Sequence, residues 1–440
     1  MDSLMKWILN CIYVLLLLVL SPVILWRSLR HGRYRNGWRE KLFGSLPIST
    51  GDNPVVWFHA VSVGEVVQLQ KIVDAFRTET GDTFRIVVTS STDTGFGLAT
   101  SRFSDCTVSW FPLDFSWAVA NAIRRVKPAM VVLVELELWP NFLSECGTAG
   151  VMTALANARM SERSFRGYSR VRPIMAPLLG QFNVVAAQTE EYASRLRRLG
   201  TSATATQVTG SIKFDGVTAN HENAATIEFR RLFSISDGDV VLIAGSTQHP
   251  EEQMALDAWM ELRKERTNLR LILVPRHKER FDDVAAVVRA SGCQLYRRSE
   301  SSEENAAPRN AAILLDTIGE LSACWGLADI AFVGGSFGPR GGQNMLEPAA
   351  HGAAVLFGPN TWNFKDIVDQ LRRAEAAVQL QTQDEFLPTV KRLLSDADAR
   401  NRLGQNARKI IVAQQGAVEK TTRLLCDELS GGRLASRDAA

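Results

Sequence analysis

The chain has 440 residues, of which 46% are hydrophobic and 22% are charged. These values are typical of a folded globular protein of two or three domains, and they exclude a disordered or collagen-like chain. There are 50 lysines and arginines against 47 aspartates and glutamates, and the resulting net charge of +3 argues against a protein whose whole surface binds nucleic acid.

The N-terminal segment is strongly apolar. The 20 residues from Trp7 to Trp26 contain no charged side chain, and a helix of that length can span a hydrocarbon core of ~30 Å. A cleaved signal peptide is the alternative, but the apolar run is long, a basic cluster follows it and no Ala-x-Ala cleavage site is evident. We therefore expect residues 1–26 to be a retained single-pass membrane anchor that contributes nothing to the cores of the domains.

A basic cluster follows the apolar run. Six basic residues and one acidic residue lie within positions 27–41. The positive-inside rule places this juxtamembrane segment, residues 27–50, and everything after it on the cytoplasmic side. We expect the cluster to lie against an anionic membrane surface at about 1 kcal/mol per basic residue, and a topology signal with no further role is the alternative.

After residue 50, short runs of β-branched and aromatic residues alternate with amphipathic stretches, a pattern that is typical of βαβ units with a parallel sheet. The strands predicted in the first half are Val55–Val61, Phe84–Ser90, Thr107–Leu113, Met130–Leu136, Val151–Asn157 and Asn183–Gln188. Those predicted in the second half are Val240–Ala244, Leu269–Val274, Gln294–Tyr296, Ala312–Leu315, Ile330–Val333 and Ala353–Phe357.

This alternation predicts an α/β protein with two βαβ domains in tandem and a cleft between them. The first domain covers residues 51–215 and the second covers residues 240–395. A polar, strand-free linker over 216–239 separates them, and a helical tail follows over 396–440. Ligands of such sheets bind beyond the carboxyl ends of the strands, so motifs that directly follow a predicted strand are the candidates for function.

Three motifs of the first domain carry side chains suited to catalysis. Glu65 opens a helix just after the strand end at His59–Val61, where it could act as a general base or merely complement the helix dipole. Alternation along the strand places Glu135 and Glu137 on one face before a Trp-Pro turn, which is unusual for a buried strand. Lys213, among apolar neighbours at the end of the domain, could hold an anion or be an ordinary surface lysine.

Motifs of the second domain also follow predicted strands. A Gly-Ser turn at Ala244–Thr247 precedes a helix with Glu251 and Glu252 in its first turn, and it offers free N–H groups to a phosphate. Pro275-Arg276 follows the next strand, and Asp316–Leu321 follows another. We expect these segments to meet at one edge of the second sheet.

The glycine-rich segment Gly334–Pro348 contains five glycines in its first nine residues, which suggests that the backbone approaches a ligand closely. Glu347, in a helix that we expect to begin near Gln343, could reach a ribose diol. Gly334–Gly338 also matches the Gly-x-Ser-x-Gly elbow of α/β-hydrolases. That assignment is excluded because Glu347 and His351 lie on one helix and cannot complete the triad in the required order.

Neither a metal site nor a cofactor is expected. The six histidines never form a His-x-x-x-His pair, and the six cysteines include no Cys-x-x-Cys pair, since the closest two are 31 positions apart. Free thiols in a reducing compartment are the simplest interpretation of the cysteines.

Taken together and in this order, the motifs resemble those of the 3-deoxy-manno-octulosonic acid (Kdo) transferases of lipopolysaccharide synthesis. The resemblance covers nearly the whole chain and rests on the N-terminal anchor followed by His59–Glu65, Glu135–Asn141, Asn157–Ser164, Gly210–Asp215 and Gly341–Pro348. Each motif alone is weak, whereas the ordered set is specific. The one mild departure is Leu136, where the family more often has threonine between the two glutamates.

The resemblance implies a GT-B fold with two facing Rossmann-like domains. It also implies an inverting glycosyltransferase that moves Kdo from CMP-Kdo to a lipid A precursor, lipid IVA, on the cytoplasmic face of the inner membrane. By the same resemblance, Glu65 is the proton acceptor, and Glu135 and Lys213 stabilise the transition state. The implied CMP contacts are Pro275, Arg276, Ile318, Gly319, Glu320, Asn344, Met345, Leu346 and Glu347.

Two other classes of function stay open at this point. Another membrane-associated GT-B glycosyltransferase would use a different nucleotide sugar, and a membrane-anchored binding protein would keep the cleft without needing Glu65. A second basic stretch from Arg159 to Arg172 could meet the phosphates or carboxylates of the acceptor, or it could be a solvated helix face.

Overall fold

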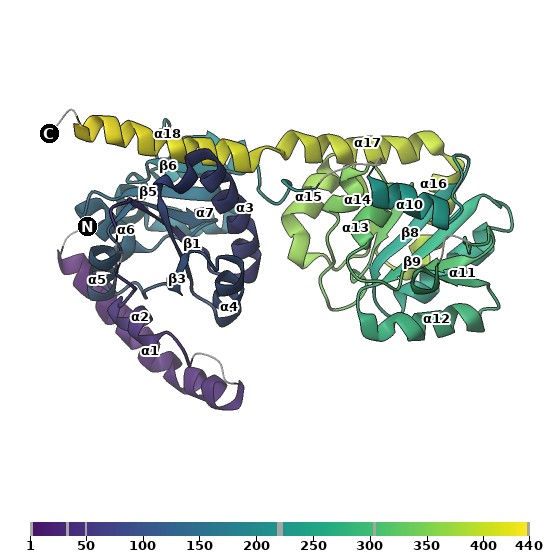
Figure 1. The fold of residues 1–440 in the computed structure, drawn as a ribbon, viewed down its shortest axis with the longest axis horizontal. Helices are drawn as coiled ribbons and strands as arrows, with labels where there is room; N and C mark the ends of the chain where they lie inside the picture. Colours follow the sequence, from purple (N-terminus) through teal and green to yellow (C-terminus); the bar gives the residue numbers. More distant parts are fainter. Residues whose placement is uncertain (1–2, 32–34, 49–50, 218–222, 302–304, 438–440) are drawn as a thin grey trace. The chain divides into compact units, whose positions relative to one another are not determined.

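The computed structural model describes residues 3–31, 35–48, 51–217, 223–301 and 305–437 (Figure 1). The chain forms two compact units. Unit 1 comprises Met1–Asp215 and Gln414–Ala440, and unit 2 comprises Gly216–Ala413. The C-terminal segment therefore divides between the two units instead of forming one tail.

Unit 1 is built on a seven-stranded parallel sheet with the order β3-β2-β1-β4-β5-β6-β7. The chain order reverses between β1 and β4, and ligands of open α/β sheets bind beside such a switch point. The strands are β1 Val55–His59, β2 Arg85–Ser90, β3 Thr107–Trp110, β4 Pro128–Val134, β5 Met152–Ala158, β6 Val184–Ala187 and β7 Thr206–Val208.

Helices cover both faces of this sheet, so its strands are apolar throughout. In β1, Val55 and Trp57 join one apolar core, while Val56 and Phe58 join the core on the other face. Figure 1 shows α18 beside α3, which places the end of the chain on the first unit. The helices of unit 1 are α1 Ser3–His31, α2 Trp38–Phe43, α3 Val63–Thr80, α4 Asp93–Arg102, α5 Ser116–Val126, α6 Pro140–Thr148, α7 Glu162–Arg170, α8 Arg172–Leu179, α9 Glu190–Leu199 and α18 Ala417–Arg437.

Helix α1 is long and apolar enough to cross a membrane, with a mean hydropathy of 2.7 over its most apolar window. Most of its large apolar side chains are exposed. Its N-terminal part nevertheless contacts unit 1, since Lys6 Nζ lies 2.5 Å from Glu145 Oε1 on α6. The helix therefore begins as part of the surface of unit 1.

Two further residues of α1, Asn10 and Tyr13, form what we call the α1 latch. The amide of the buried Asn10 donates to Ser116 Oγ at 2.8 Å and accepts from the Ser116 N–H at 3.0 Å. The Tyr13 hydroxyl donates to Asp114 Oδ2 at 3.0 Å. None of the described α1 side chains joins the apolar clusters of the sheet, as expected, but the helix is not separate from the fold, because the latch satisfies buried polar groups of the domain.

Unit 2 repeats the architecture with a second seven-stranded parallel sheet, in the order β10-β11-β9-β8-β12-β13-β14. Its strands are β8 Val240–Thr247, β9 Leu269–Pro275, β10 Leu295–Arg297, β11 Ala312–Leu314, β12 Ile330–Val333, β13 Ala354–Phe357 and β14 Ala377–Gln379. Its helices are α10 Ala224–Leu232, α11 Glu251–Leu262, α12 Phe281–Ala290, α13 Leu321–Cys324, α14 Leu346–Ala350, α15 Lys365–Arg373, α16 Phe386–Ser395 and α17 Ala397–Gln414.

The observed fold confirms the predicted α/β class, with differences at the edges of the sheets. β7 and β14, which have three residues each and pair with a single neighbour, were not predicted. The expected linker over 216–239 contains α10, whose Phe229 and Leu232 are buried. This segment is therefore part of unit 2 and not only a connection.

Candidate active site

Glu65 lies where β1 gives way to α3. Ser62 caps the helix by accepting from the Glu65 N–H at 3.4 Å. The Glu65 carboxylate in turn accepts from the Val61 N–H at 2.9 Å and from the Ser62 hydroxyl at 2.8 Å. This reciprocal arrangement is a form of the capping box, and it fixes the carboxylate at the carboxyl edge of the sheet.

The surroundings of Glu65 favour its use as a base. Burial raises the pKa of its carboxyl group, and the charge of Glu135 raises it further, while the hydrogen bonds from Val61 and Ser62 oppose the shift. A carboxylate has about four lone-pair sites, so two hydrogen bonds leave capacity to accept a proton. A raised pKa strengthens a carboxylate as a general base near neutral pH.

Glu135 directly follows β4 and adopts a left-handed backbone with φ 63°. Such a conformation costs about 1–3 kcal/mol for a residue other than glycine and is concentrated at functional sites. It also ends the regular alternation, so the prediction that Glu135 and Glu137 share a strand face is wrong: the strand ends at Val134. Both carboxylates instead reach one region through the turn that follows.

Two cations from other parts of the chain face Glu135. Lys213 Nζ lies 3.9 Å from Glu135 Oε1, and Arg159 Nη1 lies 3.8 Å from Glu135 Oε2. All three side chains are only partly exposed. The structure thus brings Glu135 and Lys213 together, as a shared role for the two residues requires.

Glu137 adds a third carboxylate, which the catalytic set predicted from the sequence did not include. Burial raises its pKa to about 7, and the charges of Glu65 and then Glu135 contribute in the same direction. Its partner Trp139 donates from Nε1 to Glu137 Oε2 at 2.8 Å and opposes the shift. These shared effects place Glu65, Glu135 and Glu137 close to one another.

The loop that carries Lys213 is held at both ends. Upstream, the Ile212 N–H donates to Oδ1 of the buried Asn157 at 3.2 Å. Downstream, the Asp215 carboxylate accepts from the Gly416 N–H at 2.7 Å and from the Val418 N–H at 2.5 Å. Asn157 and Asp215 therefore position Lys213. Both lie within segments that contributed to the resemblance, but no periodicity or spacing signals these contacts.

The basic stretch after β5 does not act as one surface. Arg159 turns toward Glu135, whereas Arg166 pairs with Glu162 on α7 at 3.0 Å. No residue of α7 is buried, which matches a solvated helix face.

In unit 2, the Gly-Ser turn at Ala244–Thr247 does not open the following helix directly. Helix α11 begins at Glu251, four residues beyond Thr247. The buried Glu251 carboxylate accepts from the N–H groups of Gly335 at 2.8 Å, Ser336 at 3.0 Å and Phe337 at 3.1 Å. Glu251 thus satisfies the N–H groups at the start of the glycine-rich segment that follows β12.

Some of the glycines in this segment have structural reasons as well. A Cβ on Gly334 would lie 2.5 Å from Thr247 Cα, and one on Gly341 would lie 2.3 Å from Trp362 Nε1.

Helix α14 begins at Leu346, not near Gln343, because Asn344 Oδ1 accepts from the Leu346 N–H at 3.1 Å and so ends the loop there.

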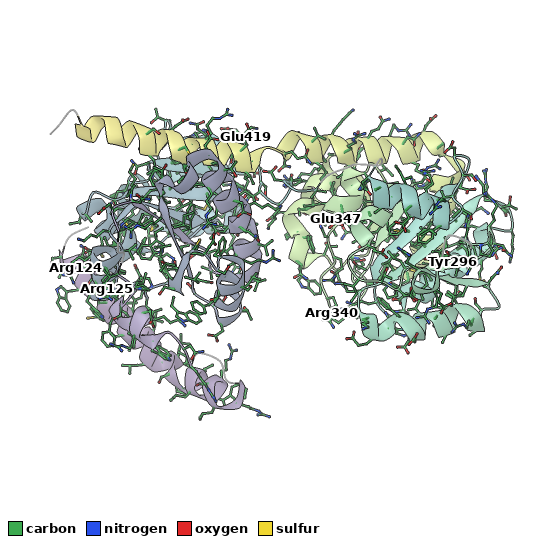
Figure 2. All side chains as sticks on the ribbon, viewed as in Figure 1. Arg124, Arg125, Tyr296, Arg340, Glu347 and Glu419 are labelled. Carbon is green, nitrogen blue, oxygen red and sulfur yellow. The ribbon has the colours of Figure 1, made fainter. Side chains whose placement is uncertain are left out.

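The predicted nucleotide-binding residues follow β9, β11 and β12, so the parallel sheet gathers them at its carboxyl edge. Asn344 donates to Glu347 Oε1 at 3.0 Å, and burial raises the pKa of Glu347. Figure 2 labels Glu347 and Arg340 on the same side of unit 2. The exposed side chains here include Arg276 and Ile318, while Pro275, Met345 and Leu346 are buried.

Glu320 and Gly319 lie at the same edge of the sheet but differ in how freely they could contact a ligand. The Glu320 carboxylate accepts from Arg298 Nη2 at 3.0 Å and from the Thr317 hydroxyl. Gly319 has φ 90°, and a Cβ there would meet no atom within 4 Å, so its side faces open space. The backbone of Gly319 is therefore better placed than the Glu320 side chain to meet a ligand.

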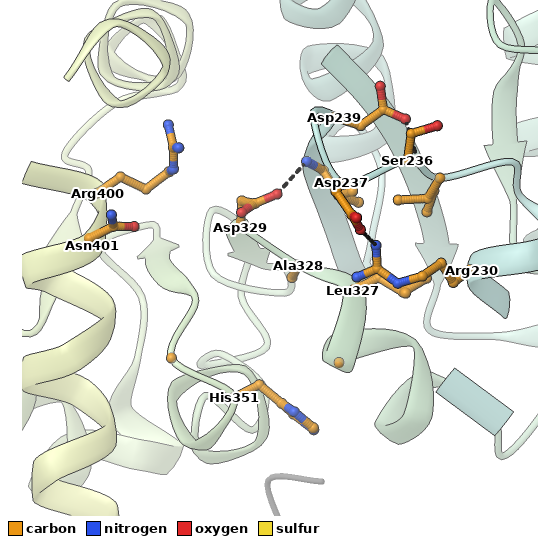
Figure 3. Close-up of a pocket in the computed structure, with 14 residues that line it drawn as sticks. Arg230, Ser236, Asp237, Asp239, Leu327, Ala328, Asp329, His351, Arg400 and Asn401 are labelled. Carbon is orange, nitrogen blue, oxygen red and sulfur yellow. Dashed lines mark hydrogen bonds and ion pairs between the residues drawn. The ribbon is translucent and has the colours of Figure 1, made fainter. Parts of the chain in front are cut away.

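A separate polar cavity of unit 2, with a volume of about 290 Å³, is shown in Figure 3. It lies near the amino ends of the strands, since Asp239 and Asp329 directly precede β8 and β12. Asp329 accepts from the Val241 N–H at 2.8 Å, and Arg230 pairs with Asp237 at 3.6 Å. These contacts link separate segments of unit 2 at the edge of the sheet opposite to the predicted nucleotide-binding residues.

Unit 1 thus carries a cluster of carboxylates with a lysine, and unit 2 carries a glycine-rich, polar edge of its own sheet. Among the described residues, no group of three or more His, Cys, Asp or Glu side chains is placed to hold a metal ion. The cluster of unit 1 can supply proton abstraction by a carboxylate together with stabilisation of developing charge.

Comparisons with known proteins identify the family of the chain. Residues 36–216 match the family described as 3-deoxy-D-manno-octulosonic-acid transferase (kdotransferase). The 3-deoxy-D-manno-octulosonic acid transferase of Bordetella pertussis is 34% identical and covers 95% of this chain and 99% of the relative. The enzyme of the same name from Haemophilus influenzae is 32% identical, with 94% and 97% covered.

A solved structure also shares the fold. The UDP-GlcNAc 2-epimerase from Neisseria meningitidis, bound to UDP-GlcNAc, has a TM-score of 0.51 at 10% identity and covers 86% of this chain and all of the epimerase. This likeness supports the two-sheet GT-B architecture alone. The two relatives are more than 30% identical to this chain over nearly its whole length. The chain therefore belongs to the 3-deoxy-D-manno-octulosonic acid transferase family of glycosyltransferases.

Proposed function

We propose that this chain transfers Kdo from CMP-Kdo to lipid IVA with inversion at the anomeric carbon, and that Glu65 is the general base. The family establishes a Kdo transferase of lipopolysaccharide biosynthesis, and the proposal adds the donor, the acceptor and the roles of the residues.

In the proposed reaction, a hydroxyl oxygen of the acceptor attacks the anomeric carbon of Kdo as the bond from that carbon to the CMP phosphate oxygen breaks. The hydroxyl proton passes to the Glu65 carboxylate, and CMP leaves with the bonding electron pair. The anomeric carbon passes through an oxocarbenium-like state, which a nearby carboxylate such as Glu135 stabilises. Lys213 offsets the negative charge of the Kdo carboxylate or of the departing phosphate.

The observation that carries the proposal is the meeting of Glu65, Glu135 and Lys213. These residues come from the loops after β1, β4 and β7, yet Lys213 lies 3.9 Å from Glu135, and Glu135 raises the pKa of Glu65. A protein that only binds a ligand has no need of a carboxyl group with a raised pKa, here Glu65, near a second carboxylate that pairs with a lysine, so the cluster favours catalysis.

On the donor side, we propose that CMP binds at the carboxyl edge of the sheet in unit 2. Glu347 is suited to accept hydrogen bonds from the ribose hydroxyls, since the hydrogen bonds from Asn344 and Ser322 use only part of the capacity of a carboxylate with about four lone-pair sites. Arg276 is exposed beside Pro275 and can pair with the phosphate of CMP.

For localisation, we propose a retained anchor in the inner membrane with both units in the cytoplasm. The support is the apolar helix α1 and the basic residues that follow it.

The test measures CMP release from CMP-Kdo by the purified full-length chain, with and without lipid IVA. We expect release to depend on lipid IVA and the product to gain one or more Kdo groups by mass spectrometry. Release that depends on a different nucleotide sugar would favour another glycosyltransferase. Binding of CMP-Kdo without any transfer would favour a binding protein.

A further inference from the structure

An apolar groove of about 520 Å³ runs along unit 1 between α1 and α2. Leu17 and Ile24 of α1 form one wall, Leu42 and Phe43 of α2 form the other, and Phe115 and Trp117 close the base. Ser21 is the one polar residue among those that line it. The stretch of α1 from Val14 to Leu25 gives the groove a length of roughly 18 Å at 1.5 Å per residue.

The groove forms because the face of α1 toward unit 1 is polar near its N-terminus and apolar further along. The helix face that meets unit 1 carries Asn10 and Tyr13 first and then Leu17 and Ile24. The α1 latch holds the first part through hydrogen bonds to Ser116 and to Asp114. The second part remains partly exposed although its side chains are apolar, so the fold leaves an apolar trough open.

The groove lies at the same edge of the sheet as the catalytic cluster. Helix α2 packs beyond β3, where the Leu113 N–H donates to the Lys41 carbonyl and Lys41 Nζ sits 3.6 Å from the ring centroid of Trp110, the last residue of β3. In the sheet β3 is two strands from β1, which leads to Glu65. Two strand spacings correspond to about 10 Å.

Positive charge borders the groove. Arg27 and Arg30 lie on α1 just after Leu25, and Arg39 and Lys41 lie on α2. An apolar trough bordered by cations matches a lipid whose acyl chains adjoin phosphate groups. It is unlike a protein-binding face, where basic side chains would need acidic partners.

We propose that this groove binds an acyl chain of the lipid acceptor and so positions its sugar hydroxyl toward Glu65. The proposal rests on the proposed function, because it assumes a phosphorylated, acylated sugar as the acceptor. A bulk membrane phospholipid could fill an apolar trough anywhere on unit 1. The acceptor is favoured because the groove lies at the catalytic edge of the sheet and because basic residues adjoin its lining residues on both α1 and α2.

The test fills the groove and measures acceptor kinetics. Leu17→Trp places a larger side chain inside it, and Leu15→Trp is the matched control, since Leu15 is 62% exposed on the opposite side of α1. Ser21→Phe fills the groove at a second position. The full-length protein is assayed in nonionic detergent micelles with saturating CMP-Kdo and a varied mole fraction of lipid IVA.

For both groove variants we expect the KM for lipid IVA to rise at least tenfold while kcat and the Kd of CMP stay within twofold of wild type. Leu15→Trp should leave all three values unchanged. The proposal is overturned if the KM is unaffected in both groove variants, or if Leu15→Trp raises it equally. It is also overturned if the groove variants lose only their binding to anionic phospholipid vesicles, since bulk lipid would then be the occupant. If the wild-type protein transfers nothing to lipid IVA, the proposed function fails instead.

Discussion

Replacing Glu65 by glutamine separates the catalytic role of this residue from its role in the helix cap. In the capping arrangement, the glutamine Oε1 can still accept from the Val61 N–H, and its Nε2 can donate to Ser62 Oγ. Glutamine is an accepted residue at this position of a capping box, so stability should change little. Glu65→Ala loses both bonds and should cost about 1 kcal/mol.

The effect on the reaction should be much larger. Loss of a general base lowers a rate by about 10²–10⁴. At ~1.4 kcal/mol per factor of ten, this loss corresponds to about 2.7–5.4 kcal/mol of transition-state stabilisation. Because the Gln variant keeps the cap, its rate loss cannot be attributed to a displaced α3.

The assay measures kcat for CMP release at saturating CMP-Kdo and lipid IVA, the Kd of CMP by calorimetry and the melting temperature. Glu79→Gln, at an exposed position of the same helix, is the matched control and should behave as wild type. Glu65→Gln should lose at least a hundredfold in kcat with an unchanged Kd and melting temperature, whereas Glu65→Ala should also melt roughly 2–4 °C lower. If Glu65→Gln keeps most of its kcat, Glu65 is not the base.

Four further outcomes follow from the same structure. Glu135→Gln removes the charge that raises the pKa of Glu65, so the pKa of Glu65 falls and the acidic limb of the pH profile of kcat/KM should move to lower pH; a shift to higher pH would contradict the arrangement. Glu347→Ala should weaken CMP binding in calorimetry without lowering kcat at saturation. Transfer with purified CMP-Kdo should survive EDTA, since no described cluster of ligands could hold a metal, and activity restored only by Mg²⁺ would refute this. Deleting residues 1–26 removes the α1 latch, and the resulting loss of a partner for buried Asp114 should cost about 1–3 kcal/mol in unfolding measurements. The truncated protein should still bind anionic but not neutral vesicles through residues 27–41, with binding that fades at high salt, and equal binding to both would assign the cluster to topology alone.

The sequence by itself determined the fold class, because every long strand of both sheets is an apolar, β-branched run that only a doubly covered parallel sheet can bury. It also determined that Glu65 opens a helix, since the capping pattern of Ser62 and Glu65 is local to four residues. The short edge strands β7 and β14 escaped prediction because their order comes from one neighbouring strand and not from their own composition.

Only the tertiary structure decided which side chains meet. Glu135 and Lys213 are far apart in the chain, and their approach depends on the order of strands in the sheet and on Asn157 and Asp215, which hold the lysine loop. The left-handed turn at Glu135 also overrides the alternation that the strand pattern predicts.

The same holds for α1, where the sequence shows a run long and apolar enough to cross a membrane. The structural role of Asn10 and Tyr13 within that run depends on their hydrogen-bond partners, Ser116 and Asp114, which only the folded structure places beside them. Hydrophobicity along a chain is a local property and can be read from sequence, whereas the partner of a buried polar group is set by packing between distant segments.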